Sequence, residues 1–136
     1  MTYNSRAALR QYTQVGTQSE ASSASPHRLI QMLYEGALES VTKAKGHMVR
    51  QQIPEKCSQI SRALAIIVDG LEASLNLEAG GEIAENLAAL YDYMARQLVE
   101  ANIRNSPDIL DEVHRLLSEI KEGWDGIAPE VGMGSS

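Results

Sequence analysis

The sequence predicts an all-α protein, an antiparallel up-down four-helix bundle with an N-terminal arm or short capping helix. Four stretches carry apolar residues at alternating steps of three and four, the spacing that places them on one side of an α-helix. Two pairs, Ser25-Pro26 and Ser106-Pro107, are typical helix starts, because Ser caps free amides and Pro is tolerated in the first turn. Short turns between these helices favour antiparallel neighbours.

Composition agrees with this fold class. The 136 residues suffice for one domain with a real core, and 43% of them are hydrophobic. The aromatic residues are one Trp and five Tyr, with no Phe, so aliphatic side chains must fill the interior. We expect a mobile arm over residues 1–24, the bundle over 25–128 and a disordered tail over 129–136.

The helix expected from Glu82 to Arg104 organises the bundle. Its predicted core face consists of Leu87, Leu90, Met94, Leu98 and Ala101. Tyr91 and Tyr93 lie on opposite shoulders of that face. At least one of them is expected at the bundle margin, where the ring packs while its hydroxyl stays wet.

The first long helix is expected from Pro26 to Arg50. Its core positions are Ile30, Leu33, Ala37, Val41, Ala44 and Met48. Further apolar residues widen the arc beyond the single stripe of an ordinary surface helix: Leu29, Met32, Tyr34 and Leu38. Either this helix is central to the bundle, or part of the excess is a binding surface.

The remaining two helices have narrower stripes. The second is expected from Pro54 to about Glu78, ended by Gly80-Gly81, and its spacing places Ile66 away from the core. The last helix follows Ser106-Pro107 with the stripe Ile109, Val113, Leu116, Ile120 and Trp124, flanked by Leu110 and Leu117. Trp124 is expected to plug the core.

Charge and cysteine content exclude several classes of protein. The net charge is −6 and the pI is about 5.0, with Lys and Arg scattered singly, which disfavours nucleic acid as a partner. Cys57 is the single cysteine, so a disulfide framework is excluded, and a half-buried thiol in a reducing compartment is expected. We expect a cytoplasmic protein without stable membrane insertion, because no run approaches about 20 apolar residues.

The residues offer no catalytic set. Di-iron bundles need inward carboxylates and paired Glu-x-x-His motifs, whereas this chain has only Asp111-x-x-His114. His27, His47 and His114 fall outside the core stripes and are expected to be solvated. We therefore expect neither an enzyme nor a metal or cofactor site, and the excess apolar surface favours an interaction protein.

Several stretches of the chain together carry a resemblance to a known family. They are residues 25–37, SPHRLIQMLYEGA, then residues 80–87, GGEIAENL, and 90–94, LYDYM, followed in order by Leu98, Ala101-Asn102 and the helix over 112–124. In this order they resemble the FliS family, the flagellar export chaperones: the first stretch resembles that family's first long helix, and the next two resemble its central signature. The similarity spans almost the whole chain, and the joint spacing carries it rather than any single motif.

The resemblance implies an antiparallel bundle that binds the disordered C-terminal segment of flagellin in the cytoplasm. Binding would prevent premature polymerisation and deliver flagellin to the membrane gate of the flagellar type III export apparatus. In the arm, the resemblance assigns Leu9, Tyr12 and Val15 to covering the groove and contacting the gate.

The expected partner-binding residues combine the arm, the first helix and the organising helix: Leu9, Tyr12, Val15, Leu29, Met32, Leu33, Tyr34, Tyr91 and Tyr93. The alternative is a structural helical module that self-associates through the same apolar surface without binding flagellin. That alternative predicts a weak homodimer. For residues 1–24, the alternative to a functional arm is a frayed terminus without a role.

Overall fold

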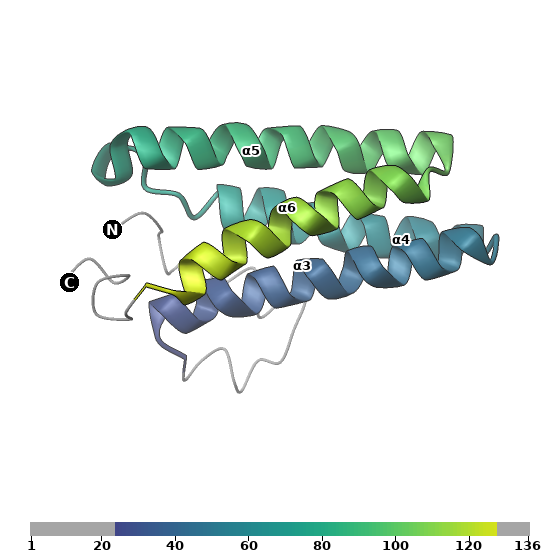
Figure 1. Cartoon of the computed structure of the whole chain (residues 1–136), viewed down its shortest axis with the longest axis horizontal. Coiled ribbons are helices and arrows are strands. Elements are labelled where there is room, and N and C mark those ends of the chain that lie inside the picture. Colours follow the sequence, from purple (N-terminus) through teal and green to yellow (C-terminus); the bar gives the residue numbers. More distant parts are fainter. Residues whose placement is uncertain (1–23, 128–136) are drawn as a thin grey trace.

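The computed structural model describes residues 24–127, which form four antiparallel helical rods (Figure 1). Helix α3 spans Pro26–Val49; α4 spans Ile53–Leu64 and continues into the π-helix η1, Ala65–Glu72; α5 spans Leu77–Arg104 and α6 spans Pro107–Asp125. The expected all-α four-helix bundle is confirmed. The expected arm and tail lie outside the described residues. Within residues 24–127, no helix is long and apolar enough to span a membrane.

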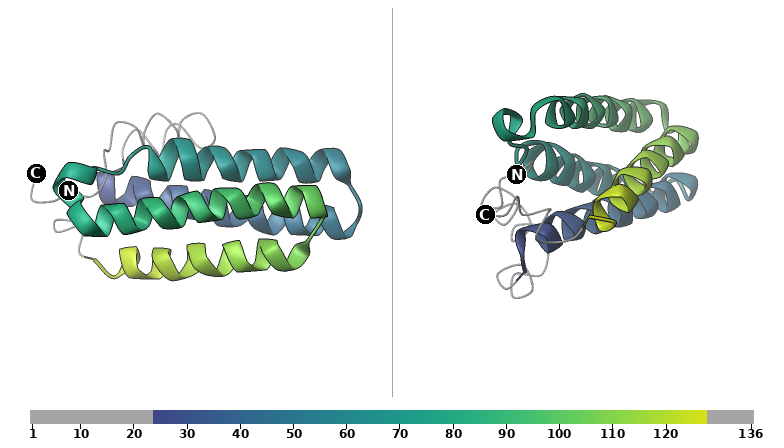
Figure 2. Two further views of the ribbon diagram at one scale, coloured as in Figure 1. Left: turned by 90° about the horizontal axis from the view of Figure 1, so that it is seen from above. Right: turned by 60° about the vertical axis from the view of Figure 1, so that its left-hand side comes forward.

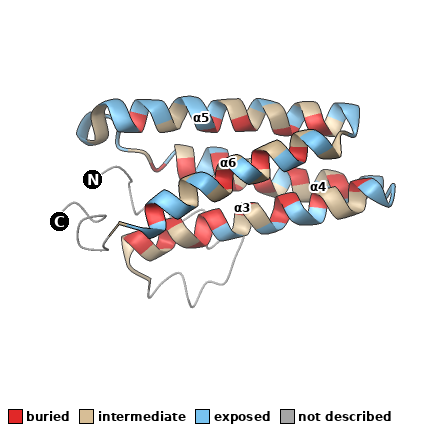
Figure 3. Cartoon of the chain, in the orientation of Figure 1, coloured by how far each residue is buried: buried red, intermediate tan, exposed pale blue. Residues whose placement is uncertain are grey.

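Helix α3 is central to the bundle. It packs against α4, η1 and α6, while α5 packs against the same three elements from the opposite side (Figure 2). The apolar excess of α3 therefore faces neighbours: Leu29, Met32 and Tyr34 are 3%, 1% and 1% exposed. Figure 3 shows buried residues concentrated on the sides where helices meet.

The helix starts form as the Ser-Pro pairs predict. Ser25 Oγ accepts the amide hydrogen of Arg28 at 3.1 Å, and Ser106 Oγ accepts that of Ile109 at 3.3 Å. Each bond satisfies one of the amides that a helix leaves free at its amino end. Local sequence therefore determines where α3 and α6 begin.

The second helix differs from expectation in its last part. It ends at Glu72 rather than Glu78, and its final eight residues form the π-helix η1. Hydrogen bonds from residue i to i+5 place more residues in each turn than an α-helix holds, which changes the direction of successive side chains. Ile66 and Ile67 are consequently both fully buried, whereas Val68 is 37% exposed, so the prediction that Ile66 points away was wrong.

The sequence suggested that Gly80 and Gly81 end the second helix. In the structure they lie inside α5 instead. Gly81 has φ 55° and ψ −134° and kinks α5 near its start. This conformation is essentially restricted to glycine, because a Cβ atom would clash with the backbone. The first turn of α5 is held instead by Asn76, whose Oδ1 accepts the Ala79 amide at 3.0 Å.

The buried faces of α5 and α6 are rotated relative to the predicted stripes. Tyr91 is fully buried, whereas Leu90, expected in the core, is 37% exposed. In α6, Leu110 and Leu117 are buried, while the predicted stripe residues Ile109, Leu116 and Ile120 are only partly buried against the core. Each helix carries two adjacent apolar rows, and the positions of its neighbours decide which row is covered.

Glu72, at the end of η1, gives a pH-dependent prediction. Burial, a hydrogen bond with Asp92 and repulsion from that carboxylate raise the pKa of Glu72 from 4.5 to about 6. Because the folded protein holds this proton more tightly than the unfolded chain does, protonated Glu72 contributes stability that is fully present below pH 4.5. That stability is lost as the pH rises through about 6. The ionised Glu72 therefore destabilises the fold at neutral pH.

We expect Glu72→Gln to raise the free energy of unfolding by about 1 kcal/mol near pH 7.5, a figure discounted for solvent screening of a half-exposed pair. The gain should decline as the pH falls through 6 and disappear below 4.5. Urea unfolding across this range measures it, with the exposed Glu85→Gln as control. A gain that does not change with pH would contradict the Glu72–Asp92 interaction as its cause.

Candidate partner-binding surface

A buried tyrosine pair joins α3 to α5 in the middle of the bundle. The hydroxyls of Tyr34 and Tyr91 are hydrogen-bonded to each other, and the two side chains are 1% and 0% exposed. Buried hydroxyls require such partners. Tyr91 therefore belongs to the core and does not lie at the margin.

Tyr93 is the tyrosine at the margin, where it links α5 to α6. Its hydroxyl donates to Glu112 Oε2 at 2.7 Å, and Gln97 Nε2 donates to the other carboxylate oxygen at 3.0 Å. The hydrogen bond from Tyr93 and then that from Gln97 lower the pKa of Glu112. The bond to Glu112 also raises the pKa of Tyr93. The cluster holds the two helices together near their shared turn.

The expected partner-binding residues fall into three groups. Five of them are at most 3% exposed and contribute to the core: Leu29, Met32, Leu33, Tyr34 and Tyr91. Tyr93 is half-buried. The three residues of the arm, Leu9, Tyr12 and Val15, lie outside the described residues. A role of any of these in partner binding stays a prediction.

Three apolar residues of α5 are not fully buried, although the sequence assigned two of them, Leu87 and Leu90, to the core face and none of them to a binding surface. We call Ile83, Leu87 and Leu90 the α5 row, since their spacing of four and three places them on one side of the helix. Ile83 is 67% and Leu90 37% exposed, and Leu87 is half-buried. The helical spacing of Leu87 and Leu90 can be read from the sequence. That spacing is the same for an apolar face in the core and for an apolar face on the surface, so it does not distinguish the two.

The α5 row lies where α5 and α6 separate. Figures 1 and 2 show α6 beside α5 at their shared turn and then crossing away toward α3. Among the helices of residues 24–127, α6 therefore covers the carboxyl-terminal half of α5 more than its amino-terminal half. Leu116 and Ile120 of α6 are only partly buried against the core. Apolar side chains that are not fully buried are therefore present on both α5 and α6.

Trp124 fixes the carboxyl end of α6 to the start of α3. Its indole Nε1 donates to the backbone oxygen of His27 at 3.0 Å, and the two rings stack with centroids 4.7 Å apart and an interplanar angle of 17°. The core position of Trp124 is as expected. The expectation of a solvated His27 was wrong, because the stack leaves this residue only 4% exposed.

A polar cluster lies beside this stack. Gln31 Nε2 donates to Asp125 Oδ1 at 2.9 Å, and Lys121 Nζ donates to Oδ2 at 2.6 Å. Burial raises the pKa of Asp125, but the hydrogen bonds from Lys121 and Gln31 outweigh it, and the pKa is lowered overall. The cluster thus adds a second link between the two helix ends.

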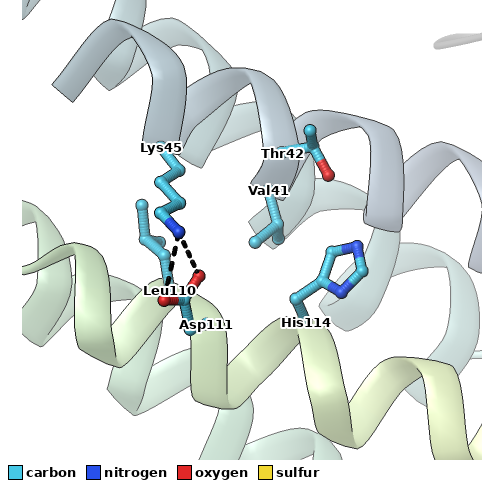
Figure 4. Close-up of a pocket in the computed structure, with 6 residues that line it drawn as sticks. All are labelled: Val41, Thr42, Lys45, Leu110, Asp111 and His114. Atoms are coloured by element: carbon cyan, nitrogen blue, oxygen red, sulfur yellow. Dashed lines mark hydrogen bonds and ion pairs between the residues drawn. The ribbon is translucent and has the colours of Figure 1, made fainter. Parts of the chain in front are cut away.

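A small pocket between α3 and α6 has a volume of about 190 Å³ (Figure 4). Its lining consists of Val41, Thr42, Lys45, Leu110, Asp111 and His114. Lys45 Nζ pairs with Asp111 Oδ1 at 2.9 Å, so this carboxylate is engaged in joining the helices. Within residues 24–127, no group of three His, Cys, Asp or Glu side chains is arranged to hold a metal ion.

Comparison with known proteins gives a consistent result. The model of the family described as flagellar protein FliS matches residues 8–131. The chain is 52% identical over 121 residues to flagellar secretion chaperone FliSB of Pseudomonas aeruginosa, covering 89% of this chain and 95% of that protein. It is 43% identical over 128 residues to flagellar secretion chaperone FliS of Salmonella typhimurium, covering 94% and 95%. The FliS of Bacillus subtilis is 31% identical over 107 residues, covering 79% and 78%.

Proposed function

Because the chain belongs to the FliS family of flagellar proteins, we propose that it is a cytoplasmic export chaperone for flagellin. It binds the disordered C-terminal segment of flagellin, prevents premature polymerisation and delivers the subunit to the flagellar type III export gate. The relatives' names support a secretion chaperone. The exposed apolar side chains of the α5 row support the proposal that the ligand is a flexible segment with apolar side chains.

A disordered ligand that folds on binding must offset its ordering entropy with a large apolar contact. An amphipathic helix laid against apolar side chains is a common way to achieve this. Ile83 and Leu90 are exposed large apolar side chains, and both lie on the half of α5 from which α6 has separated. A helical segment of flagellin placed there would cover them.

The buried residues act in this proposal by supporting the surface. Tyr34 holds Tyr91 through the hydroxyl pair, and Tyr91 directly follows Leu90 of the α5 row. Leu29, Met32 and Leu33 pack in the same core. We propose that Leu9, Tyr12 and Val15 of the arm cover the surface in the unloaded protein and contact the export gate.

Calorimetric titration with the C-terminal segment of the cognate flagellin tests the proposal. We expect stoichiometric binding with a large negative heat-capacity change, since apolar surface is buried as the segment folds. Ile83→Asp should weaken binding by about 30-fold, because it removes an apolar anchor and buries a charge. Ile103→Asp is the matched control, since Ile103 is 72% exposed on the same helix and points to the opposite side.

Two outcomes would contradict the proposal. Absence of binding at micromolar concentrations, with the bundle shown to be folded by circular dichroism, would exclude flagellin as the ligand. Equal weakening by the Ile83 and Ile103 substitutions would place the contact elsewhere. If sedimentation instead reported a concentration-dependent dimer that Ile83→Asp abolishes, the self-associating module would be the better description.

A further inference from the structure

The pocket between the carboxyl-terminal half of α3 and the first turns of α6 is a second surface with distinct chemistry (Figure 4). Its volume is about 190 Å³, and its lining comes from these two helices, with no residue of α5. The pocket is therefore separate from the α5 row. A ligand in the pocket and a ligand on the α5 row contact different residues.

The volume of the pocket limits what it can hold. Pockets that bind free small molecules usually measure about 300 to 1,000 Å³. At about 190 Å³, this pocket is closer in size to an engineered cavity of about 150 Å³ that binds benzene. It therefore accommodates one side chain or one ring, and it is too small for a nucleotide or a cofactor with several rings.

The inner wall of the pocket is apolar. It includes Val41 of α3 and Leu110 of α6, which are 1% and 0% exposed and belong to the hydrophobic core of the bundle. A polar group placed against these two side chains would lose its contact with water and gain no hydrogen bond. The part of an occupant that reaches the inner wall must therefore be apolar.

The charged groups at the opening neutralise each other. Lys45 Nζ lies 2.9 Å from Asp111 Oδ1 and 3.1 Å from Oδ2, and the two side chains are 44% and 53% exposed. A charged occupant would attract one member of this pair and repel the other, whereas a neutral occupant leaves the pair intact. The opening therefore favours a group without net charge.

His114 and Thr42 add uncharged polar atoms on the other side of the opening. In Figure 4 the imidazole of His114 lies across the opening from Lys45 and Asp111 and faces the α3 wall that carries Thr42. His114 is half-buried and Thr42 is exposed. A neutral imidazole has one donor and one acceptor nitrogen, and a hydroxyl can act as either. The outer part of an occupant therefore meets hydrogen-bonding groups.

We propose that this pocket binds the side chain of a tyrosine that another protein presents on its surface. The ring lies against Val41 and Leu110, and the phenol hydroxyl forms a hydrogen bond with His114 at the opening. Tyrosine suits such a boundary because its ring is apolar while its hydroxyl stays in contact with polar groups. A wholly aliphatic side chain would displace water from His114 and Thr42 without replacing its hydrogen bonds.

The test uses the full-length protein and four blocked tripeptides, whose central residue is tyrosine, phenylalanine, leucine or lysine between two alanines. Methyl NMR spectra of Val41 and Leu110 report binding, because the ring current of an aromatic occupant shifts the signals of methyl groups that it contacts. We expect saturable shifts with the tyrosine peptide. The phenylalanine peptide should bind about fivefold more weakly, the effect of one net hydrogen bond, and the leucine and lysine peptides more weakly still.

Two variants locate the contact. Thr42→Phe places a ring of the protein itself at the opening and should abolish binding of the tyrosine peptide. His114→Ala should reduce the difference between the tyrosine and phenylalanine peptides to less than about twofold, because it removes the partner of the phenol hydroxyl. The matched control is His47→Ala, a half-buried histidine of α3 outside the pocket, whose Nδ1 is hydrogen-bonded to Gln52. Circular dichroism checks that each variant is folded.

Four outcomes would overturn the proposal. Absence of saturable shifts up to the solubility limit of the tyrosine peptide would exclude the site, and stronger binding of the leucine peptide would show an aliphatic contact. An unchanged preference for tyrosine in His114→Ala would place the hydroxyl elsewhere. If Tyr12→Ala shifted the Val41 signals without any peptide, the occupant would be the chain's own arm. His114→Ala should leave binding of the flagellin segment unchanged, so this test and that of the proposed function can fail independently.

Discussion

Replacing Ile66 with aspartate should lower the free energy of unfolding by at least about 4 kcal/mol, because it removes a buried aliphatic side chain and leaves a carboxylate in the core. Ile66 is fully buried in η1. Its contacts include the middle of α3, since a Cβ atom on Gly36 would lie 3.3 Å from Ile66 Cδ1. We therefore expect a protein that is largely unfolded at room temperature.

Val68→Asp is the matched control, two residues away in the same π-helix. Val68 is 37% exposed, so a carboxylate there can reach water, and the cost should stay below about 1 kcal/mol. Urea unfolding followed by circular dichroism measures both variants. If Ile66→Asp were tolerated and Val68→Asp were severe, the second helix would continue as a regular α-helix and η1 would be absent in solution.

The second large effect is expected at Trp124. Trp124→Ala should lower the free energy of unfolding by about 3 to 4 kcal/mol, as is usual for removal of a large buried aromatic side chain. The loss includes the stack on His27 and the hydrogen bond to its backbone oxygen. Trp124→Phe retains much of the packing and should lower the free energy of unfolding by about half as much. The remaining loss arises because Phe cannot donate to the backbone oxygen of His27, which is left unpaired.

Gly123→Ala provides the control for Trp124. A Cβ atom at this exposed helical position meets nothing within 4 Å. Alanine is favoured over glycine in a helix, so stability should be unchanged or rise by up to about 1 kcal/mol. Urea unfolding of the three variants measures these differences. A Trp124→Ala protein as stable as Gly123→Ala would mean that α6 is not anchored to α3 through this residue.

Much of the fold could be predicted because its signals are local. The caps at Ser25 and Ser106 depend on residues within one helical turn, and they form as expected. The core position of Trp124 follows from its place in an apolar stripe. The kink at Gly81 and the π-helix at Ile66 could not be predicted, because a helical wheel assumes one uniform geometry along each helix.

The candidate surface was harder to predict than the fold. Leu29 was proposed for binding and is 3% exposed, whereas Leu90 was assigned to the core and is 37% exposed. Both residues are leucines at the edge of an apolar arc. What distinguishes them is the path of α6, which is a tertiary property. His27 is similar, since only the ring of Trp124, far along the chain, explains its burial.

The π-helix also affects how the length of this chain can change. A π turn contains more residues than an α turn, so loss of one residue between 65 and 72 could leave a regular α-helix there. Elsewhere in the bundle, such a deletion would rotate the remainder of the helix by about 100° and turn its apolar face away from the core. The η1 segment is therefore where a helix of this bundle can shorten by one residue without involving a loop.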